Sequence, residues 1–170
     1  MQTLLVLTVI GEDKPGLVES IAQAITDNSG NWLESSMSQL AGKFAGVLVV
    51  SVSTDRADLL IDALNALSKE LKVVIERVNM GSENTPAQVI ELALVGNDRP
   101  GIISEISQVL TKLSINFEQL ITECVSAPMS GDFLFKAIAN VTLPKGLEID
   151  ALKEGLESLA DDLVVEIRLK

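Results

Sequence analysis

The sequence predicts two small α+β domains in tandem, each built in the order βαββαβ. Three observations lead to this prediction. A Gly-x-Asp-x-Pro-Gly motif occurs twice, a short apolar run typical of a strand precedes it each time, and apolar residues at helical spacing follow it each time. Aromatic residues make up only 3% of the chain, so we expect cores of Leu, Ile, Val and Ala.

The repeated motif extends into a longer internal duplication. Gly11–Gly16 (GEDKPG) recurs as Gly96–Gly101 (GNDRPG), an offset of 85 residues. With this offset, residues 11–32 align without a gap to residues 96–117 and share nine identities in 22 positions. The two halves of the chain are therefore copies of one unit.

The first strand and helix of each copy surround the motif. Leu4–Ile10 and Val89–Val95 are apolar runs that stop at the first glycine, as buried strands do. Pro15 and Pro100 fit a first helical turn, where a missing N–H costs little. Residues at helical spacing follow, namely Leu17, Val18, Ile21 and Ile25 in the first copy and Ile102, Ile103, Ile106, Val109, Leu110 and Leu113 in the second.

A hairpin comes next in each copy. Its strands are Trp32–Leu40 and Lys43–Val52 around Ala41 and Gly42, and then Phe117–Val125 and Phe133–Val141 around Pro128–Gly131.

A second helix and a last strand complete each copy. The helix stripes are Leu60, Leu64 and Leu67, preceded by Asp55 and Asp58, and then Leu152, Leu156 and Leu159. The last strands are Val73–Val78 and Leu163–Leu169. With right-handed crossovers, this order gives the ferredoxin-like fold, an antiparallel four-stranded sheet with two helices on one face. We expect domains at residues 1–80 and 88–170, joined by a linker at 81–87.

Charge and composition exclude several functions. The formal net charge is −11, shared by both halves, and no cluster of Lys and Arg occurs, so we expect no direct binding to nucleic acid. The single Cys124 is expected to be a small buried residue rather than a reactive thiol. Without a signal peptide or an apolar run of about 18 residues, we expect a soluble, cytoplasmic protein.

Catalytic groups are missing from the sequence. It contains no His and no Tyr, so triads of the Ser-His-Asp or Cys-His type cannot form. The G-x-x-x-x-G-K-[ST] phosphate loop does not occur either. We therefore expect no enzyme, no cofactor and no metal site. The acids on predicted helix exteriors, such as Asp62, Glu105, Glu154 and Glu157, are expected to be solvated surface residues. Glu19, beside the loop, is likewise expected to be a surface residue without a role in binding.

The repeated loop is the best candidate for a binding site. A glycine ends the strand, an Asp can accept hydrogen bonds from free helix N–H groups, and the helix N-terminus favours a carboxylate or phosphate. The second glycine keeps side chains out of this cradle, and an Asn opens the next strand near the same sheet edge. The same motif also suits a plain strand-to-helix turn, so both readings stay open. The predicted site residues are Gly11, Asp13, Gly16 and Asn31, with Gly96, Asp98, Gly101 and Asn116.

These residues resemble the ACT domain family. An Asp-Lys/Arg-Pro-Gly loop after the first strand, an amphipathic helix and an Asn before a hydrophobic residue match its pattern in both copies. The resemblance implies a regulatory module that binds a small amino acid, glycine or serine foremost, between the loop of one domain and the second strand of its neighbour. Many family members have Asn where Asp13 and Asp98 stand here.

The resemblance also implies a mode of action. We expect an accessory regulator of transcription that acts through a protein partner such as a transcription activator, with glycine metabolism as the implied context. One alternative is a free-standing allosteric subunit of a biosynthetic enzyme. A third is a purely structural dimerisation module. In each case unpaired sheet edges or faces are open to homodimer formation.

Overall fold

The computed structural model describes residues 1–78, 88–127 and 131–170. The chain divides into two compact units, Met1–Ser82 (unit 1) and Glu83–Lys170 (unit 2). The predicted linker at 81–87 and residues 128–130 of the second predicted hairpin turn lie outside the described residues.

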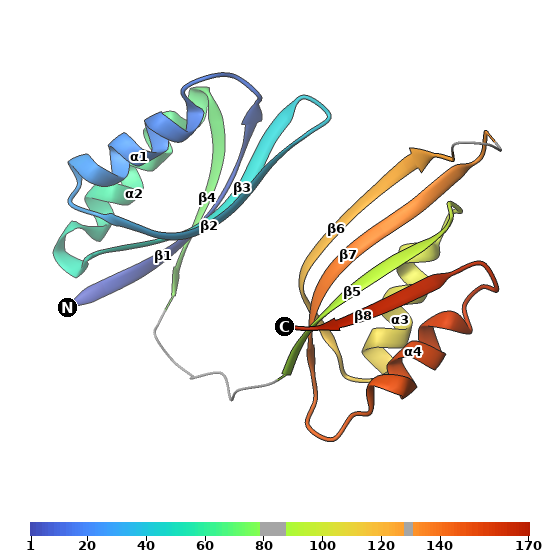
Figure 1. Ribbon diagram of the computed structural model, residues 1–170. Coiled ribbons are helices and arrows are strands. Elements are labelled where there is room, and N and C mark those ends of the chain that lie inside the picture. Colours follow the sequence, from blue (N-terminus) through green and yellow to red (C-terminus); the bar gives the residue numbers. More distant parts are fainter. Residues whose placement is uncertain (79–87, 128–130) are drawn as a thin grey trace. The chain divides into compact units, whose positions relative to one another are not determined.

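Unit 1 has the order βαββαβ (Figure 1). Its sheet is antiparallel with the strand order β2-β3-β1-β4. Short 3₁₀ turns flank its second helix. The elements are β1 (Gln2–Glu12), α1 (Leu17–Asp27), β2 (Asn31–Leu40), β3 (Lys43–Ser53), α2 (Ala57–Asn65) and β4 (Leu71–Val78).

Unit 2 repeats this plan with the strand order β6-β7-β5-β8, again antiparallel. Its elements are β5 (Gln88–Asn97), α3 (Ile102–Lys112), β6 (Asn116–Ser126), β7 (Phe133–Leu143), α4 (Ile149–Glu157) and β8 (Val164–Leu169). None of the helices in the described part of the chain is long and apolar enough to cross a membrane.

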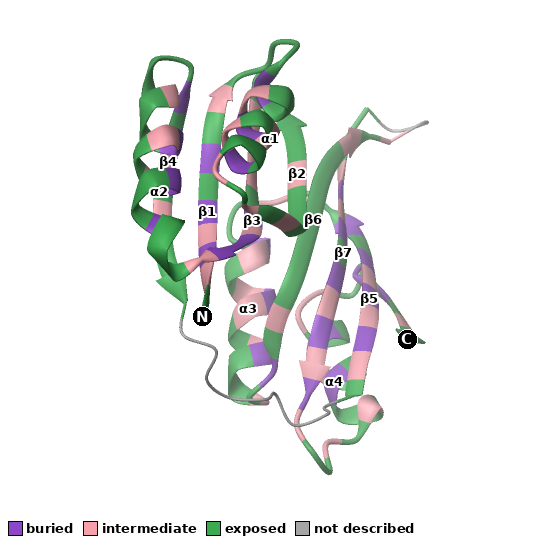
Figure 2. Ribbon diagram, turned by 90° about the vertical axis from the view of Figure 1, so that its left-hand side faces the viewer, coloured by how far each residue is buried: buried purple, intermediate pink, exposed green. Residues whose placement is uncertain are grey.

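The core of each unit lies between one face of the sheet and its two helices (Figures 1 and 2). Along β1 the buried residues Leu5, Leu7 and Val9 alternate with more exposed ones, because successive side chains of a strand point to opposite faces. The helices contribute buried residues at helical spacing: Leu17, Ile21 and Ile25 of α1, Leu60 and Leu64 of α2, Ile102, Ile106 and Leu110 of α3, and Leu152 and Leu156 of α4. The predicted fold, two ferredoxin-like units in tandem, is confirmed.

The duplication is also visible in unusual backbone geometry. Ser29 and Ser114, which follow α1 and α3, both have a positive φ, 59° and 56°. Both second strands contain a register shift two residues after their start, between Trp32 and Glu34 in β2 and between Phe117 and Gln119 in β6. Such bulges are kept as local features of a fold rather than arising at random.

Two local predictions are wrong. Pro15 and Pro100 do not lie in the first helical turn, because α1 and α3 begin two residues later, at Leu17 and Ile102. Cys124 is exposed rather than buried, because it lies on β6, the edge strand of its sheet, where helices do not cover it.

Candidate functional site

The Pro-Gly pair of each motif forms a tight turn that sets the start of the following helix. Gly16 has φ 94° and ψ −6°, and Gly101 has φ 91° and ψ −6°. These angles match the third position of a type II turn, which requires glycine and favours proline just before it. In unit 2 the turn is closed by a hydrogen bond from the Ile102 N–H to the Arg99 carbonyl, 3.4 Å. Both glycines are therefore needed for backbone conformation.

The first glycine of each motif is required for a different reason, the small space available for a side chain. Gly11 pairs with Leu71 across the sheet, and a Cβ built on it would lie 2.8 Å from both the Glu70 carbonyl oxygen and Leu71 Cδ2. The equivalent Gly96 is less crowded, since a Cβ there would lie 3.1 Å from Leu163 Cδ1. These glycines permit a close approach of the start of the last strand. Gly11 also borders an open hollow on the side of Glu70 and Leu71.

Asp13 and Asp98 do not cap the helices, contrary to the prediction. The N-cap residues are Gly16 and Gly101, and neither helix receives a side-chain cap hydrogen bond. The two Asp residues lie two residues before the Pro-Gly pair, outside the N-cap position. Their own backbone N–H groups donate instead to the Gly42 carbonyl at 3.0 Å in unit 1 and to the Phe133 carbonyl at 2.9 Å in unit 2. These bonds hold each loop against the turn between the second and third strands of its unit.

In unit 1 the loop borders an open hollow of about 490 Å³. It is lined by Asp13, Lys14, Pro15, Gly16, Leu17, Val18, Glu19 and Phe44. The first intrahelical bond of α1 runs from the Ser20 N–H to the Gly16 carbonyl, so the amides before it have no acceptor within the helix. The hollow thus combines amide donors, carboxylates and apolar side chains.

Asn31 and Asn116 lie at the opposite end of their sheets from the loops. Asn31 is beside Ser51, which in turn is beside Leu4 near the start of β1, whereas the loop follows the end of β1. Asn116 is placed in the same way, beside Thr142. The prediction that each Asn lies near the loop of its own unit is wrong, because β2 and β6 run in the same direction as β1 and β5.

Of the residues that line the hollow, sequence reasoning predicted only Asp13 and Gly16 as site residues. It missed Lys14, Pro15, Leu17, Val18, Glu19 and Phe44. Phe44 reaches the loop because the β1–β3 register places it beside Gly11. This position could have been predicted from the Ala41-Gly42 turn. The turn fixes the start of β3 at Lys43, and therefore places Phe44 at the end of the sheet where the loop lies. Glu19, which the sequence suggested to be a plain surface residue, lies in the first turn of α1 and lines the hollow.

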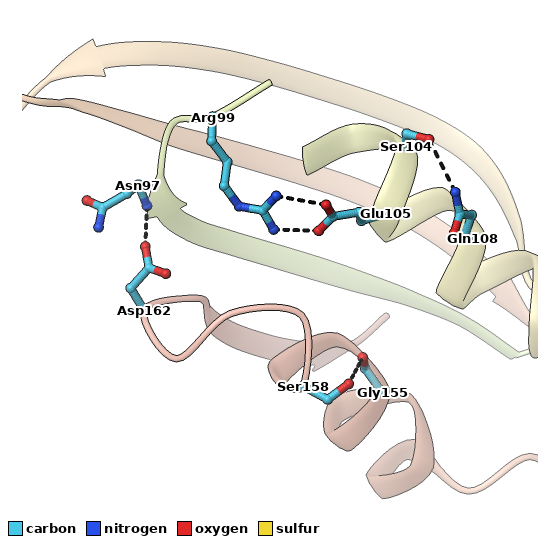
Figure 3. A network of polar contacts seen from close by, with 8 residues as sticks. All are labelled: Asn97, Arg99, Ser104, Glu105, Gln108, Gly155, Ser158 and Asp162. Carbon is cyan, nitrogen blue, oxygen red and sulfur yellow. Dashed lines mark hydrogen bonds and ion pairs between the residues drawn. The ribbon is translucent and has the colours of Figure 1, made fainter. Parts of the chain in front are cut away.

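The loop of unit 2 is surrounded by its own polar contacts (Figure 3). The Arg99 guanidinium donates two hydrogen bonds to the Glu105 carboxylate, one of them 2.8 Å from Nη1 to Oε1. This contact holds the pKa of Glu105 below its ordinary value. On the side of the α4–β8 loop, the Asn97 N–H donates to Asp162 Oδ2 at 2.7 Å.

Cys124 and Asp98 lie close together beside the same loop. They come from β6 and from the end of β5, and both strands pair with β7 at Phe135 or next to it. Loss of water around the Cys124 sulfur, then its hydrogen bond to Asp98 and the charge of that carboxylate, raise the pKa of Cys124. The thiol is exposed, and its surroundings disfavour the thiolate. Within the described residues, no group of three or more His, Cys, Asp and Glu side chains is arranged to hold a metal ion.

Comparison with known proteins gives a family model that matches the first half of the chain, and two sequence relatives that each match a little under half of it. An ACT domain family matches residues 3–77. A UPF0237 protein of Methanococcus maripaludis is 31% identical over 81 residues, which is 46% of this chain and 87% of that protein. A UPF0237 protein of Methanocaldococcus jannaschii is 29% identical over 75 residues, 44% of this chain and 78% of that protein.

Two solved structures resemble the chain over its whole length. A protein of unknown function from Galdieria sulphuraria has 26% identity and a TM-score of 0.87, with 100% of this chain and 99% of that chain covered. A candidate glycine cleavage system transcriptional repressor has 17% identity and a TM-score of 0.72, with the same coverage. At this identity the second likeness is one of fold.

Proposed function

Because the chain belongs to the ACT domain family, we propose that it is an amino-acid-sensing regulatory protein with domains at residues 1–80 and 88–170. The observation that carries this proposal is the hollow beside the loop of unit 1. It brings charged, hydrogen-bonding and apolar groups to one place, as a site for a zwitterion requires. The other possibility, that the motif only makes a turn, accounts for Gly16 but not for the hollow.

The hollow suggests how an amino acid would bind. The N–H groups of the first turn of α1, at the positive end of the helix dipole, would receive the carboxylate. The Asp13 carboxylate would receive the ammonium group, and Val18 and Phe44 would contact the α-carbon and its substituent. We propose glycine or serine as the ligand, the small amino acids that the family resemblance implies.

The proposed output is regulation of transcription through a protein partner such as a transcription activator, with glycine cleavage genes as the target. Two things support it: the net charge of −11, which disfavours direct operator contact, and the full-length likeness of fold to the candidate repressor of that system. The alternative is a free-standing allosteric subunit that docks on an amino-acid biosynthetic enzyme. Affinity capture with the purified chain, with and without added glycine or serine, separates these outcomes by the class of protein retained.

Ligand binding is tested by thermal-shift and calorimetric titration with all twenty amino acids. We expect saturable binding of glycine or serine and a rise in melting temperature, because a ligand that binds only the folded state stabilises it. A flat response across the whole panel contradicts the proposal and leaves the loop as a structural turn.

A further inference from the structure

The two loops are copies in sequence but differ in their polar contacts. Lys14 of unit 1 corresponds to Arg99 of unit 2, and Ser20 of unit 1 corresponds to Glu105. Glu19, which lines the hollow of unit 1, corresponds to Ser104. Unit 1 therefore has a carboxylate in the lining of the hollow, Glu19, where unit 2 has a serine. Unit 2 instead has the Glu105 carboxylate, which Arg99 binds.

In unit 1 the acids of the loop remain available. Lys14 also lines the hollow, and its Nζ lies 3.6 Å from the Glu70 carboxylate. Within the part of the chain that the structure describes, neither the Asp13 nor the Glu19 carboxylate accepts a side-chain hydrogen bond or forms an ion pair. Both line the same hollow, so an ammonium group bound there would face two carboxylates that no other side chain occupies.

In unit 2 the corresponding charges are occupied. Arg99 is held by Glu105 through a two-pronged contact, the geometry in which such pairs are strongest (Figure 3). Asp98, the counterpart of Asp13, lies beside Cys124 and contributes to the raised pKa of that thiol. An amino acid at this loop would have to compete with Glu105 for the arginine.

On the basis of the proposed function, we propose that the two repeats are not equivalent: the amino acid binds at the loop of unit 1 alone, where Asp13 and Glu19 together receive its ammonium group, and the loop of unit 2 is closed by its own side chains. Glu19 is then a determinant of specificity for ligands that carry a positive charge next to a carboxylate. Small carboxylates without an amino group, such as acetate, should bind poorly.

Calorimetry on the full-length chain tests this inference, with glycine, L-serine and acetate as probes. We expect one equivalent of amino acid per chain. Because hydrogen bonds to charged groups are the strong ones, Asp13→Ala should weaken binding roughly tenfold or more. Glu19→Gln should weaken amino-acid binding by a few-fold, because only one of the two carboxylates that face the ammonium group would remain. The matched variant Asp98→Ala should bind within about a factor of two of the natural chain, which is the usual outcome for changes away from a site.

The possible failures are distinguishable. Two equivalents per chain, or loss of binding in Asp98→Ala with Asp13→Ala unaffected, overturns the assignment to unit 1 and leaves amino-acid sensing intact. Acetate binding as tightly as glycine overturns the role of the two acids. Absence of binding by the natural chain overturns the proposed function together with this inference. The stoichiometry needs no variant, so the test does not depend on the folding of any mutant.

Discussion

Arg99 and Glu105 are joined across the first turn of α3, with both guanidinium nitrogens Nη1 and Nη2 bonded to the two carboxylate oxygens. Both side chains are only partly exposed, 35% and 38%. Unit 1 has no such pair, because the corresponding residues are Lys14 and Ser20 and the Ser20 hydroxyl donates to the Gly16 carbonyl instead. One contact thus distinguishes two loops that share a motif.

This pair predicts a pH dependence of stability. Arg99 lowers the pKa of Glu105 in the folded state, so the contribution is fully present above the ordinary glutamate pKa of about 4.3 and is lost as the pH falls through the lower folded value. Glu105→Gln should therefore lower the melting temperature at pH 7, and lower it less as the pH falls toward 3. Circular dichroism melts at several pH values measure this. The control Glu154→Gln, an exposed change on α4, should show no such trend; an equal effect of Glu105→Gln at both pH values contradicts the account.

The position of Asp98 beside Cys124 predicts that the Cys124 thiol is alkylated slowly. Because Asp98 contributes to the raised pKa of Cys124, replacing it by Asn should increase the thiolate fraction and speed alkylation by iodoacetamide at pH 8. Cys124 is the only cysteine, so mass spectrometry reports its modification directly. The matched change Asp13→Asn in unit 1 should leave the rate unchanged. Equal rates in all three proteins would show that Asp98 does not control this thiol.

The crowding at the first glycine of each motif predicts an asymmetry between the repeats. Gly11→Ala should lower the free energy of unfolding by roughly 1–3 kcal/mol, as overpacking does. The new methyl group would lie 2.8 Å from both the Glu70 carbonyl oxygen and Leu71 Cδ2, which is closer than a normal contact. Gly96→Ala should cost clearly less, since its nearest neighbour is the end of a leucine side chain.

Urea unfolding measures both variants. Trp32 is the only tryptophan and is packed against the core of unit 1, so its fluorescence follows that unit, while circular dichroism follows the whole chain. Equal destabilisation by the two substitutions, or a larger effect of Gly96→Ala, goes against the geometry described.

The charge of the protein predicts its behaviour with DNA. With a formal net charge of −11, it has few cations to neutralise phosphates, and the release of counterions that drives such binding is largely absent. The isolated chain should not shift promoter fragments of glycine cleavage genes in a gel at moderate salt. A salt-dependent shift without any partner protein would refute a mode of action through a protein partner.

The sequence was sufficient for the fold because the same patterns occur twice and follow regular periods. The Gly-x-Asp-x-Pro-Gly repeat, the alternation along β1 and the helical spacing after Leu17 are local properties, and each appears in the structure as expected. Their agreement in both halves removes the ambiguity that a single short run would leave.

The site was less predictable because it depends on register and on direction. Whether Asn31 approaches the loop follows from the direction of β2 in the sheet, and the position of Phe44 follows from the β1–β3 pairing. The partners of Asp98 and Arg99 depend on side-chain conformations, and no periodicity encodes these. The turn made by Pro15 and Gly16 could have been identified, since this dipeptide is typical of a type II turn.

The most direct test of amino-acid sensing at unit 1 is an NMR titration of the ¹⁵N-labelled full-length chain with glycine and then with serine. We expect the backbone amide signals of residues 13–19 to move and saturate, because these residues border the hollow, while those of residues 98–104 stay in place. A spectrum that does not change at any concentration of either amino acid, or changes confined to residues outside the loop of unit 1, would contradict the account.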